Sequence, residues 1–293
     1  MKTPWRDDVS LGARAVRALR PLRRLRGFER LAAQLAPSGQ AGEFVVRNPE
    51  GAFAGDMTSF IERRLYLFGG YEEDLIAQFR HFCADRPRRT MLDVGANVGT
   101  HSIALAHDFG AVHAFDPNGA LWPRFERNVA LSGLPNVRLH KFGLADQARD
   151  LPFYLPDGAN SGLGTLSGAE RYDTPLKQAG TARIERGDDA LAAAGIAGID
   201  AIKIDVQGFE KEVLTGLRET LRAWRPVVWL EVGEGPFAGP NGADALRTQF
   251  PYPIALSRFA CISRFPTFRY ALEPVTGAVL EKADYLIAPA QNP

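Results

Sequence analysis

Short apolar runs alternate with amphipathic segments along most of this chain, from about residue 43 to residue 288. Short apolar runs of this kind are typical of buried strands. The runs expected to be strands span residues 43–46, 52–56, 90–94, 111–116, 137–142, 151–155, 199–205, 227–231, 252–256 and 285–288. The segments expected to be helices span residues 58–68, 71–82, 100–109, 119–131, 188–194, 209–221 and 243–249. This alternation predicts an α/β fold with a mostly parallel, doubly wound sheet that binds ligands at the carboxyl ends of its strands.

The first 36 residues follow a different pattern, which is amphipathic and basic. Apolar residues recur there at spacings of three and four, at Leu19, Leu22, Leu25, Phe28, Leu31 and Leu35. The spacing predicts helix, which Pro21 should kink or restart and Gly27 should weaken. We therefore expect a basic amphipathic helical extension over residues 1–40, lead-in strands and helices over 41–90, and the main domain over 90–293.

The charge is distributed unevenly along the chain. The net charge is +1, but residues 1–36 alone carry +6 and the remainder carries −5. A body without a bulk positive field predicts no nucleic-acid partner. The basic extension suits peripheral contact with an anionic membrane, packing on the main domain, or packing on a partner subunit. An Arg-rich transit peptide is a weaker alternative, because Asp7 and Asp8 are unusual for one.

Targeting and redox signals are sparse. Cys83 and Cys261 do not make a disulfide framework. No apolar run approaches the roughly 18 residues of a membrane span. The first residues lack the apolar region of a signal peptide. We expect a cytoplasmic protein that can also touch the inner face of the membrane through residues 1–36.

A glycine loop follows the expected strand 90–94. Gly95 and Gly99 permit a tight turn into a helix and a close approach of the backbone to a ligand. The dinucleotide fingerprint is absent, since Asn97 stands in place of its middle glycine, and so is the Gly-Lys-Ser/Thr ending of a Walker loop. Asp93 at the strand tip would repel a pyrophosphate and attract an ammonium, directly or through water. S-adenosylmethionine carries an ammonium and a sulfonium but no phosphate, so it is the expected cofactor.

Asp116 ends the next expected strand, 23 residues after Asp93. An acid about 20 residues beyond a glycine loop typically binds the ribose hydroxyls of a nucleotide-type cofactor. The alternative is that both aspartates only cap helices. A further tip, at Gly143, Leu144 and Asp146, could contact an adenine amino group, and for Asp146 the alternative is a turn aspartate.

Two later strand tips also carry acids. Asp205 follows a buried strand that contains Lys203, and Glu231 ends the neighbouring strand. Lys203 and Asp205 lie two residues apart and therefore face the same side of the sheet. A lysine is costly to bury unless it is paired or functional, so a purely structural ion pair is the alternative.

Taken together, the motifs resemble the FkbM-type methyltransferases. The matching segments are Leu92-Asp93-Val94-Gly95-Ala96-Asn97-Val98-Gly99, Ala114-Phe115-Asp116-Pro117-Asn118, Lys203-Ile204-Asp205-Val206-Gln207-Gly208-Phe209-Glu210, the strand ending in Glu231, and the lead-in Gly69-Gly70-Tyr71-Glu72. The resemblance covers about residues 43–290. It implies a Rossmann-like class I methyltransferase with a seven-stranded sheet, which methylates a hydroxyl, often on a sugar or a secondary metabolite. The family more often has Glu at positions 116 and 207, and Gln207 cannot act as a base.

The resemblance and the strand tips give the expected site. The predicted cofactor-binding residues are Glu72, Asp93, Gly95, Ala96, Asn97, Gly99, Thr100, Asp116, Pro117, Gly143, Leu144, Asp146 and Asp205. The predicted catalytic residues are Asp205, Glu231, Glu210, Lys203 and His101. We expect Asp205 to be the general base, with Glu231 and Glu210 as alternatives. His101 is either near the ligand or an ordinary helix residue. No metal ligand is assigned, although Asp205 and Glu231 could hold a magnesium ion.

The expected acceptor is a small molecule or a glycan, including a surface polysaccharide or a lipid-linked glycan, and its pocket should involve residues 160–168 and the segment after Glu231. The alternative reading is a cofactor-binding or scaffold protein without turnover, which Gln207 favours. Methylation of protein or nucleic acid, and an NAD oxidoreductase, have weaker support.

Overall fold

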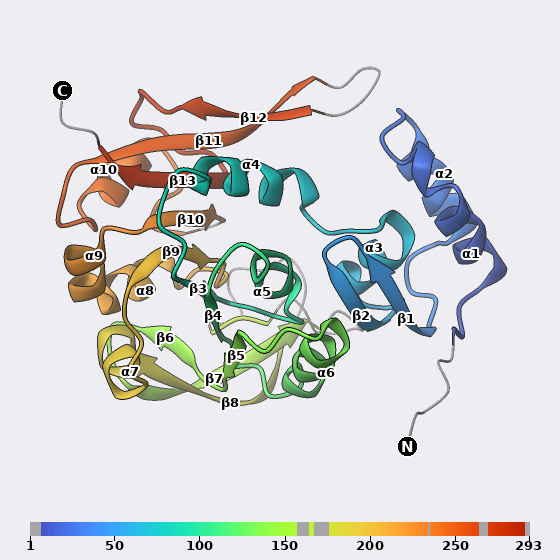
Figure 1. The fold of residues 1–293 in the computed structure, drawn as a ribbon, viewed down its shortest axis with the longest axis horizontal. Helices are drawn as coiled ribbons and strands as arrows, with labels where there is room; N and C mark the ends of the chain where they lie inside the picture. Colours follow the sequence, from blue (N-terminus) through green and yellow to red (C-terminus); the bar gives the residue numbers. More distant parts are fainter. Residues whose placement is uncertain (1–6, 157–163, 167–175, 234, 264–268, 291–293) are drawn as a thin grey trace.

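The computed structural model describes residues 7–156, 164–166, 176–233, 235–263 and 269–290. Its main sheet has eight strands in the order β12-β11-β13-β10-β9-β3-β4-β5 (Figure 1). Their bounds are β3 Thr90–Val94, β4 Ala111–Phe115, β5 Val137–His140, β9 Ile199–Ile204, β10 Val227–Val232, β11 Ile254–Ser263, β12 Arg269–Pro274 and β13 Ala283–Pro289.

The five strands from β5 to β10 are parallel, and β13 runs antiparallel to both β10 and β11. The sheet is therefore mostly parallel and doubly wound, as predicted, but it has eight strands instead of seven because β12 adds to β11 at the edge. The chain builds outward from β3 in both directions, so the order switches between β3 and β9. A switch point of this kind is where open α/β sheets bind ligands.

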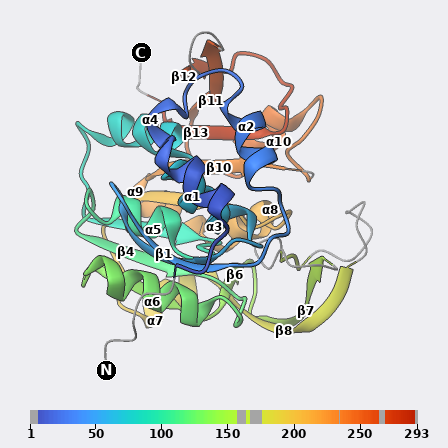
Figure 2. The same cartoon turned by 90° about the vertical axis from the view of Figure 1, so that its right-hand side faces the viewer.

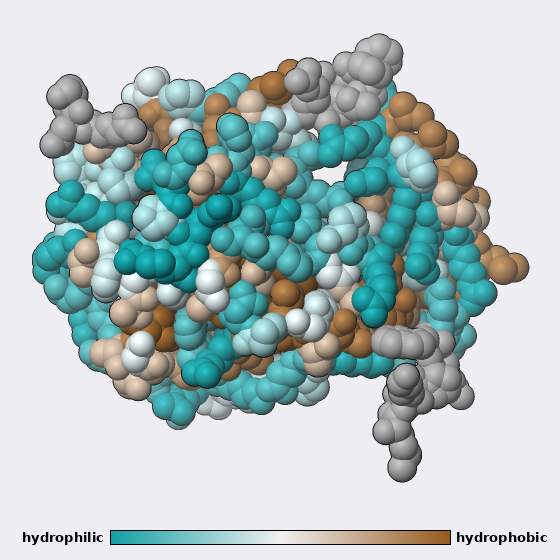
Figure 3. Space-filling model, in the orientation of Figure 1, coloured by the Kyte–Doolittle hydropathy of each residue, from teal (hydrophilic) through white to brown (hydrophobic). Residues whose placement is uncertain are grey.

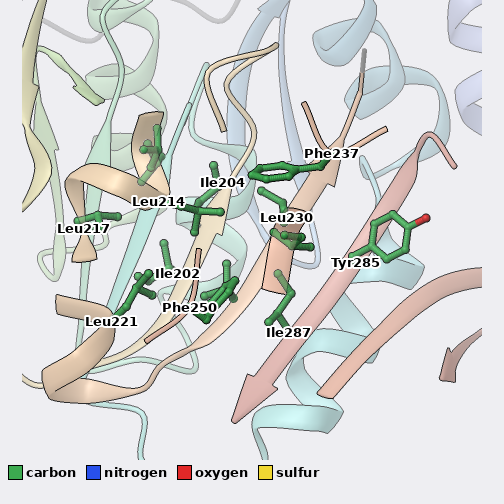
Figure 4. Close-up of a cluster of buried hydrophobic side chains, with 14 of the residues drawn as sticks. Ile202, Ile204, Leu214, Leu217, Leu221, Leu230, Phe237, Phe250, Tyr285 and Ile287 are labelled. Atoms are coloured by element: carbon green, nitrogen blue, oxygen red, sulfur yellow. The ribbon is translucent and has the colours of Figure 1, made fainter. Parts of the chain in front are cut away.

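Helices cover both faces of the sheet. Helices α4 (Glu73–Cys83) and α5 (Thr100–Leu105) pack on one face against Met91, Ala201 and Trp229. On the other face lie α7 (Gly187–Ala193), α8 (Glu210–Gly216), α9 (Arg218–Trp224) and α10 (Gly242–Arg247). Figure 4 shows leucines of α8 and α9 against Ile202 and Ile204 of β9. Burial of these apolar side chains is the main stabilising term for both layers.

Two of the expected helices are divided or shorter in the structure. The expected helix 209–221 is two helices, which meet at Leu217, and the expected helix 100–109 is regular only to Leu105. The expected strand 151–155 is part of β7 (Arg149–Pro156), which forms a second sheet in the order β6-β8-β7 with β6 (Gly143–Ala145) and β8 (Leu176–Arg186). Figure 2 shows β7 and β8 extending away from the body. The exposed, polar β8 and the edge strand β12 were not predicted, because neither has a continuous apolar run.

The N-terminal part contains α1 (Leu11–Ala18), the 3-10 turn η1 (Arg20–Leu22) and α2 (Phe28–Leu35), followed by the hairpin β1 (Glu43–Asn48) and β2 (Gly51–Asp56) and helix α3 (Phe60–Phe68). The helix is interrupted at Pro21, as predicted, and Gly27, which was expected only to weaken it, precedes the start of α2. Helices α1 and α2 bury small residues and Phe28 in one cluster with the hairpin, α3 and Ile103 of α5. No helix in the described part of the chain is long and apolar enough to cross a membrane.

The sequence predicted an apolar stripe in the extension and left open whether it faces the main domain, a partner subunit or a membrane. Only Phe28 of the six residues is buried, whereas the leucines are exposed. The buried side instead contains Ala13, Val16 and Ala32, because α1 and α2 cross closely. A Cβ on Gly12 would lie 1.8 Å from the carbonyl oxygen of Leu35.

Helix α6 (Trp122–Ser132) joins the lead-in hairpin to the glycine loop. The buried side chain of Asn128 accepts a hydrogen bond from the Ala54 amide at 2.8 Å and donates one to the Val98 carbonyl at 3.0 Å. The hairpin therefore supports the loop from behind.

Candidate active site

A cavity of about 280 Å³ opens at the carboxyl ends of β3, β4, β9 and β10, at the switch point. We call it the strand-end pocket. It brings together Gly95, Asn97, Asp116, Gly143, Asp205 and Glu231. Ala96, Thr100, His101, Pro117 and Leu144 also line it, so eleven of the predicted site residues meet in one place.

The glycine loop requires the residues that it has. Gly95 has a φ of 87° and Gly99 a φ of 87°, which is the left-handed region that favours glycine. A Cβ on Gly95 would lie 1.8 Å from the carbonyl oxygen of Asp205. The amides of Gly95 and Ala96 donate to the Phe115 carbonyl at 2.9 and 3.1 Å, which fixes the turn against β4. The loop therefore packs tightly on the backbone that follows β9, and we call this turn the glycine cradle.

Asp116 lines the pocket beside the glycine loop and is buried. Its two carboxylate oxygens accept the amides of Asn97 at 2.7 Å and Asn118 at 2.8 Å. Burial raises the pKa of Asp116 to about 7, although the two amide hydrogen bonds oppose this. Asp116 therefore lies in the pocket, and its ribose-binding role stays a prediction.

Asp93 does not line the pocket. It is fully buried behind the loop, where one oxygen accepts a hydrogen bond from Ser102 Oγ at 2.6 Å. Its register partner on β9 is Lys203, and the charge of Asp93 helps to raise the pKa of that lysine. The direct contact of Asp93 with an ammonium that the sequence suggested is therefore replaced by an interaction with the buried lysine.

Asp205 and Glu231 lie side by side at the tips of β9 and β10. Lys203 Nζ is 3.1 Å from Asp205 Oδ2, and the Gln207 side-chain amide donates to Asp205 Oδ1 and to Glu231 Oε2, each at 3.1 Å. The structural lysine–carboxylate pair is thus present. Gln207 joins the two carboxyl groups, and its φ of 51° aims the side chain at them.

The two carboxyl groups hold one proton at neutral pH. Burial opposes charge on Asp205, but Lys203 and the hydrogen bond with Glu231 outweigh it, so the pKa of Asp205 lies well below its usual range. The negative charge of Asp205, together with burial, raises the pKa of Glu231 to about 10. Asp205 is therefore charged and Glu231 protonated.

His101 is not isolated. Its Nε2 lies 2.9 Å from Glu72, which caps the start of α4 with a φ of 53°. Burial would raise the pKa of Glu72, but His101 and Lys203 lower it below its ordinary value. The imidazole ring packs edge-on against Trp229 with a centroid distance of 5.1 Å, and Trp229 Nε1 donates to Asp284 at 2.8 Å. A carboxylate that orients one ring nitrogen leaves the other free to accept a proton.

Four predicted residues lie elsewhere. Glu210 accepts the Gly208 amide at 2.7 Å, Asp146 pairs with Arg149 at 3.2 Å, and neither lines the pocket. Lys203 is buried below the pocket, and Gly99 shapes the loop without lining it. Among the described residues no group of three or more His, Cys, Asp and Glu could hold a metal ion. The Gln207 amide donates to both Asp205 and Glu231, and Lys203 pairs with Asp205, so both carboxyl groups already have partners within the protein.

Several lining residues were missed by the sequence analysis. The apolar and aromatic wall includes Phe60, Tyr71, Phe153 and Phe209. Tyr71 directly precedes Glu72 in the lead-in motif, so the motif could have predicted that Tyr71 lines the pocket. Phe60 starts a helix far from any motif, and no sequence signal indicated its place in the pocket. Of the expected acceptor loop, residues 160–168, the structure describes only 164–166, where Gly164 and Leu166 line the pocket; its other residues lie outside the described part.

An outer cavity of about 350 Å³ lies next to the strand-end pocket and shares Phe60 and Tyr71 with it. Glu72 lines this outer cavity, as do Arg23, Arg24 and Tyr270. Arg23 pairs with Glu73 at 3.2 Å and Arg24 pairs with Asp74 at 2.9 Å. The outer cavity therefore has a polar, charge-balanced lining with aromatic rings at its border.

The strand order with an antiparallel β13, and the glycine cradle at the switch point, define the Rossmann-like fold of class I methyltransferases. The profile of the Methyltransferase FkbM domain matches residues 93–252, which is more than half of the chain. The chain belongs to the FkbM methyltransferase family.

Three curated relatives are similar over part of the chain. The AMB antimetabolite synthetase AmbE of Pseudomonas aeruginosa is 30% identical over 55% of this chain and 9% of its own length. The hexuronic acid methyltransferase AglP of Haloferax volcanii is 28% identical over 45% of this chain and 51% of its own. The 31-O-demethyl-FK506 methyltransferase FkbM of Streptomyces tacrolimicus is 30% identical over 48% of this chain and 64% of its own. The chain thus matches less than two thirds of the length of each of these relatives.

Proposed function

We propose that this chain transfers a methyl group from S-adenosylmethionine to a hydroxyl group of a sugar, a glycan or a secondary metabolite. The observation that carries the proposal is the strand-end pocket, which joins the glycine cradle and Asp116 to the pair of His101 and Glu72. The relatives named for hexuronic acid and for 31-O-demethyl-FK506 support an acceptor of this kind.

The residues present fit the cofactor. Gly95 and Ala96 bring the backbone of the loop to the pocket wall, and Asp116 offers carboxylate oxygens to a pair of ribose hydroxyls. Leu144 and Phe115 provide an apolar wall suited to an adenine ring. When bound, S-adenosylmethionine supplies an electrophilic methyl group on a sulfonium. The protein must then position the acceptor oxygen and remove its proton.

We assign the proton acceptor to His101 in preference to Asp205. Lys203 holds Asp205 charged with a lowered pKa, which makes it a weak base, and Glu231 already carries a proton. In His101, Nε2–H donates to Glu72, so Nδ1 is left to accept the hydroxyl proton, and the carboxylate stabilises the imidazolium that forms. General base catalysis of this type contributes roughly 10²- to 10⁴-fold in rate.

Asp205 and Glu231 then act as hydrogen-bonding groups for the acceptor or the cofactor. A charged carboxylate accepts a hydrogen bond and a protonated one donates it, so the pair can hold a hydroxyl in a fixed direction. The aromatic wall of Phe60, Tyr71 and Phe153 excludes water from the reacting groups. Positioning and desolvation of this kind supply much of the rate in transfers between two bound partners.

The alternative is a cofactor-binding protein without turnover, which rests on Gln207 in place of the family's usual acid. The hydrogen bonds of Gln207 to both carboxyl groups argue against it, because they give position 207 a role that needs no charge.

The test is incubation of the purified chain with methyl-labelled S-adenosylmethionine and two acceptor sets, hexuronic acid oligosaccharides and macrolides with a free hydroxyl. We expect the label in a base-stable methyl ether. Label in a base-labile methyl ester would contradict transfer to a hydroxyl. Binding of S-adenosylhomocysteine without any transfer would favour the alternative.

A further inference from the structure

The N-terminal helices present an exposed apolar surface to solvent. It consists of Leu11, Leu19, Leu22, Leu25, Leu31 and Leu35, whose exposures range from 37% to 82%. These are six of the ten large hydrophobic side chains that are exposed in the described part of the chain. Figure 3 shows apolar residues along the right-hand edge, where Figure 1 places α1 and α2. We call this surface the leucine face. Concentration of this kind marks an interaction site.

The leucine face is held in place from behind. Ala13, Val16 and Phe28 are buried against the hairpin and α3. The Arg20 guanidinium donates to the carbonyl oxygens of Leu65 and Tyr66, which ties η1 to the end of α3. The buried side of the extension is therefore held by its own packing and hydrogen bonds. The exposed leucines take no part in these contacts.

Exposed arginines lie in the same segment of the chain as the leucine face. Arg26 and Arg30 are exposed, and neither has an ion-pair partner among the residues that the structure describes. Arg14 is also exposed and donates to the backbone oxygen of Asp7. Residues 1–36 carry a charge of +6 against −5 for the remainder of the chain. The surface is thus both apolar and positively charged.

We propose that the leucine face docks the protein on an anionic membrane surface. Leucines enter the boundary between head groups and acyl chains, while Arg26 and Arg30 meet anionic head groups. A second copy of the chain is a poorer occupant. A two-fold contact places the same patch on both subunits and would bring the unpaired arginines of the two copies together.

Docking in this orientation has a consequence for the acceptor, which rests on the proposed function. Arg23 and Arg24 of the extension line the outer cavity, and that cavity shares Phe60 and Tyr71 with the strand-end pocket. An acceptor carried on a membrane lipid would therefore reach the pocket from the side of the extension.

The test is sedimentation of the full chain with vesicles of phosphatidylcholine alone or with about a third phosphatidylglycerol. We expect binding to the anionic vesicles only, and weaker binding at high salt. Each arginine near such a surface is worth roughly a fivefold change in partitioning. The double variant Arg26→Gln/Arg30→Gln should thus lose tenfold or more, and Leu22→Gln/Leu31→Gln a similar amount.

Ile262→Gln and Val279→Gln are the matched controls, because both residues are exposed apolar side chains outside the extension. They should bind vesicles as the wild type does. Equal binding by all variants, or none to anionic vesicles, overturns the proposal. So does a dimer in light scattering that the leucine variants dissociate. Binding of S-adenosylhomocysteine, measured on the same variants, should stay unchanged. A protein that binds vesicles but does not bind S-adenosylhomocysteine would contradict the proposed function and leave the docking proposal intact.

Discussion

The Glu72 carboxylate lies 2.9 Å from Nε2 of His101, although the two residues are 29 positions apart in the chain. Glu72 is the N-cap residue directly before α4, and His101 lies in the first turn of α5, next to the glycine loop. The contact places an oriented imidazole at the edge of the strand-end pocket. It connects the lead-in segment to the catalytic chemistry, because the residue that orients the histidine comes from outside the matched family domain.

His101→Asn should lower kcat by roughly 10²- to 10⁴-fold, because it removes the proposed proton acceptor. Glu72→Gln should lower kcat by about tenfold, since the imidazolium loses its stabilising charge. Neither change should alter the affinity for S-adenosylhomocysteine by more than about threefold. His81→Asn is the control, because His81 is exposed on α4. Wild-type turnover in His101→Asn would return the role of base to Asp205.

Lys203→Met should destabilise the fold by about 3–5 kcal/mol, which is the cost of leaving a buried charge without its partner. Asp205 and Asp93 both interact with this lysine, and burial opposes charge on Asp205. Lys211→Met, at an exposed position of α8, should change stability by less than about 0.5 kcal/mol. Urea unfolding of both variants measures the difference. Equal stability would mean that the ion pair is not a structural element.

Gly95→Ala should remove cofactor binding, with a loss of affinity of about 100-fold or more. The new methyl group would collide with the Asp205 carbonyl, and alanine is strained at a φ of 87°. Gly133→Ala is the matched control, because Gly133 also has a positive φ, of 67°, but its Cβ would have open space. The control should lose about 1 kcal/mol of stability and keep its affinity. Calorimetric titration with S-adenosylhomocysteine compares them.

Acid should destabilise the protein partly through His113 and His140, whose ring nitrogens lie 3.0 Å apart. Burial lowers the pKa of His113 and lowers that of His140 to about 4. Between about pH 6.5 and pH 4 the unfolded chain therefore binds more protons than the folded chain. The free energy of unfolding is unaffected by these two histidines at neutral pH, and it decreases as the pH falls through that window.

His140→Phe should reduce this loss, because it removes one of the two titrating rings. The replacement keeps an aromatic contact with Phe115, on which the His140 ring stacks at a centroid distance of 4.6 Å. The measurement is the free energy of unfolding at pH 7 and pH 4.5 in both proteins. An identical pH dependence would show that the histidine pair is not responsible.

Motifs at strand tips predicted the pocket well, because a parallel sheet brings the tips of β3, β4, β9 and β10 to one edge whatever the remaining structure is. Side-chain direction was less predictable. Asp93 faces Lys203 behind the loop, and Glu210 turns back to its own helix start, which a strand-tip argument cannot distinguish from a pocket position.

Tertiary packing decided the remaining differences. The leucines of the extension have helical spacing, but spacing alone does not show whether they face the body of the protein or the solvent. The close crossing at Gly12 gives the inner side to small residues instead and leaves the leucines outside. The partnership of Glu72 with His101 depends on where α4 packs on α5, and no local pattern encodes that.

The most direct test of the account is a calorimetric titration of the purified chain with S-adenosylhomocysteine and, separately, with NAD at pH 6 and pH 8. The account predicts binding of S-adenosylhomocysteine with one site per chain and no binding of NAD. Because the pKa of Asp116 lies at about 7 and a ribose prefers the charged carboxylate, the affinity should rise between these two pH values and Asp116→Asn should abolish the rise. A chain that binds NAD and ignores S-adenosylhomocysteine would contradict the assignment of the pocket.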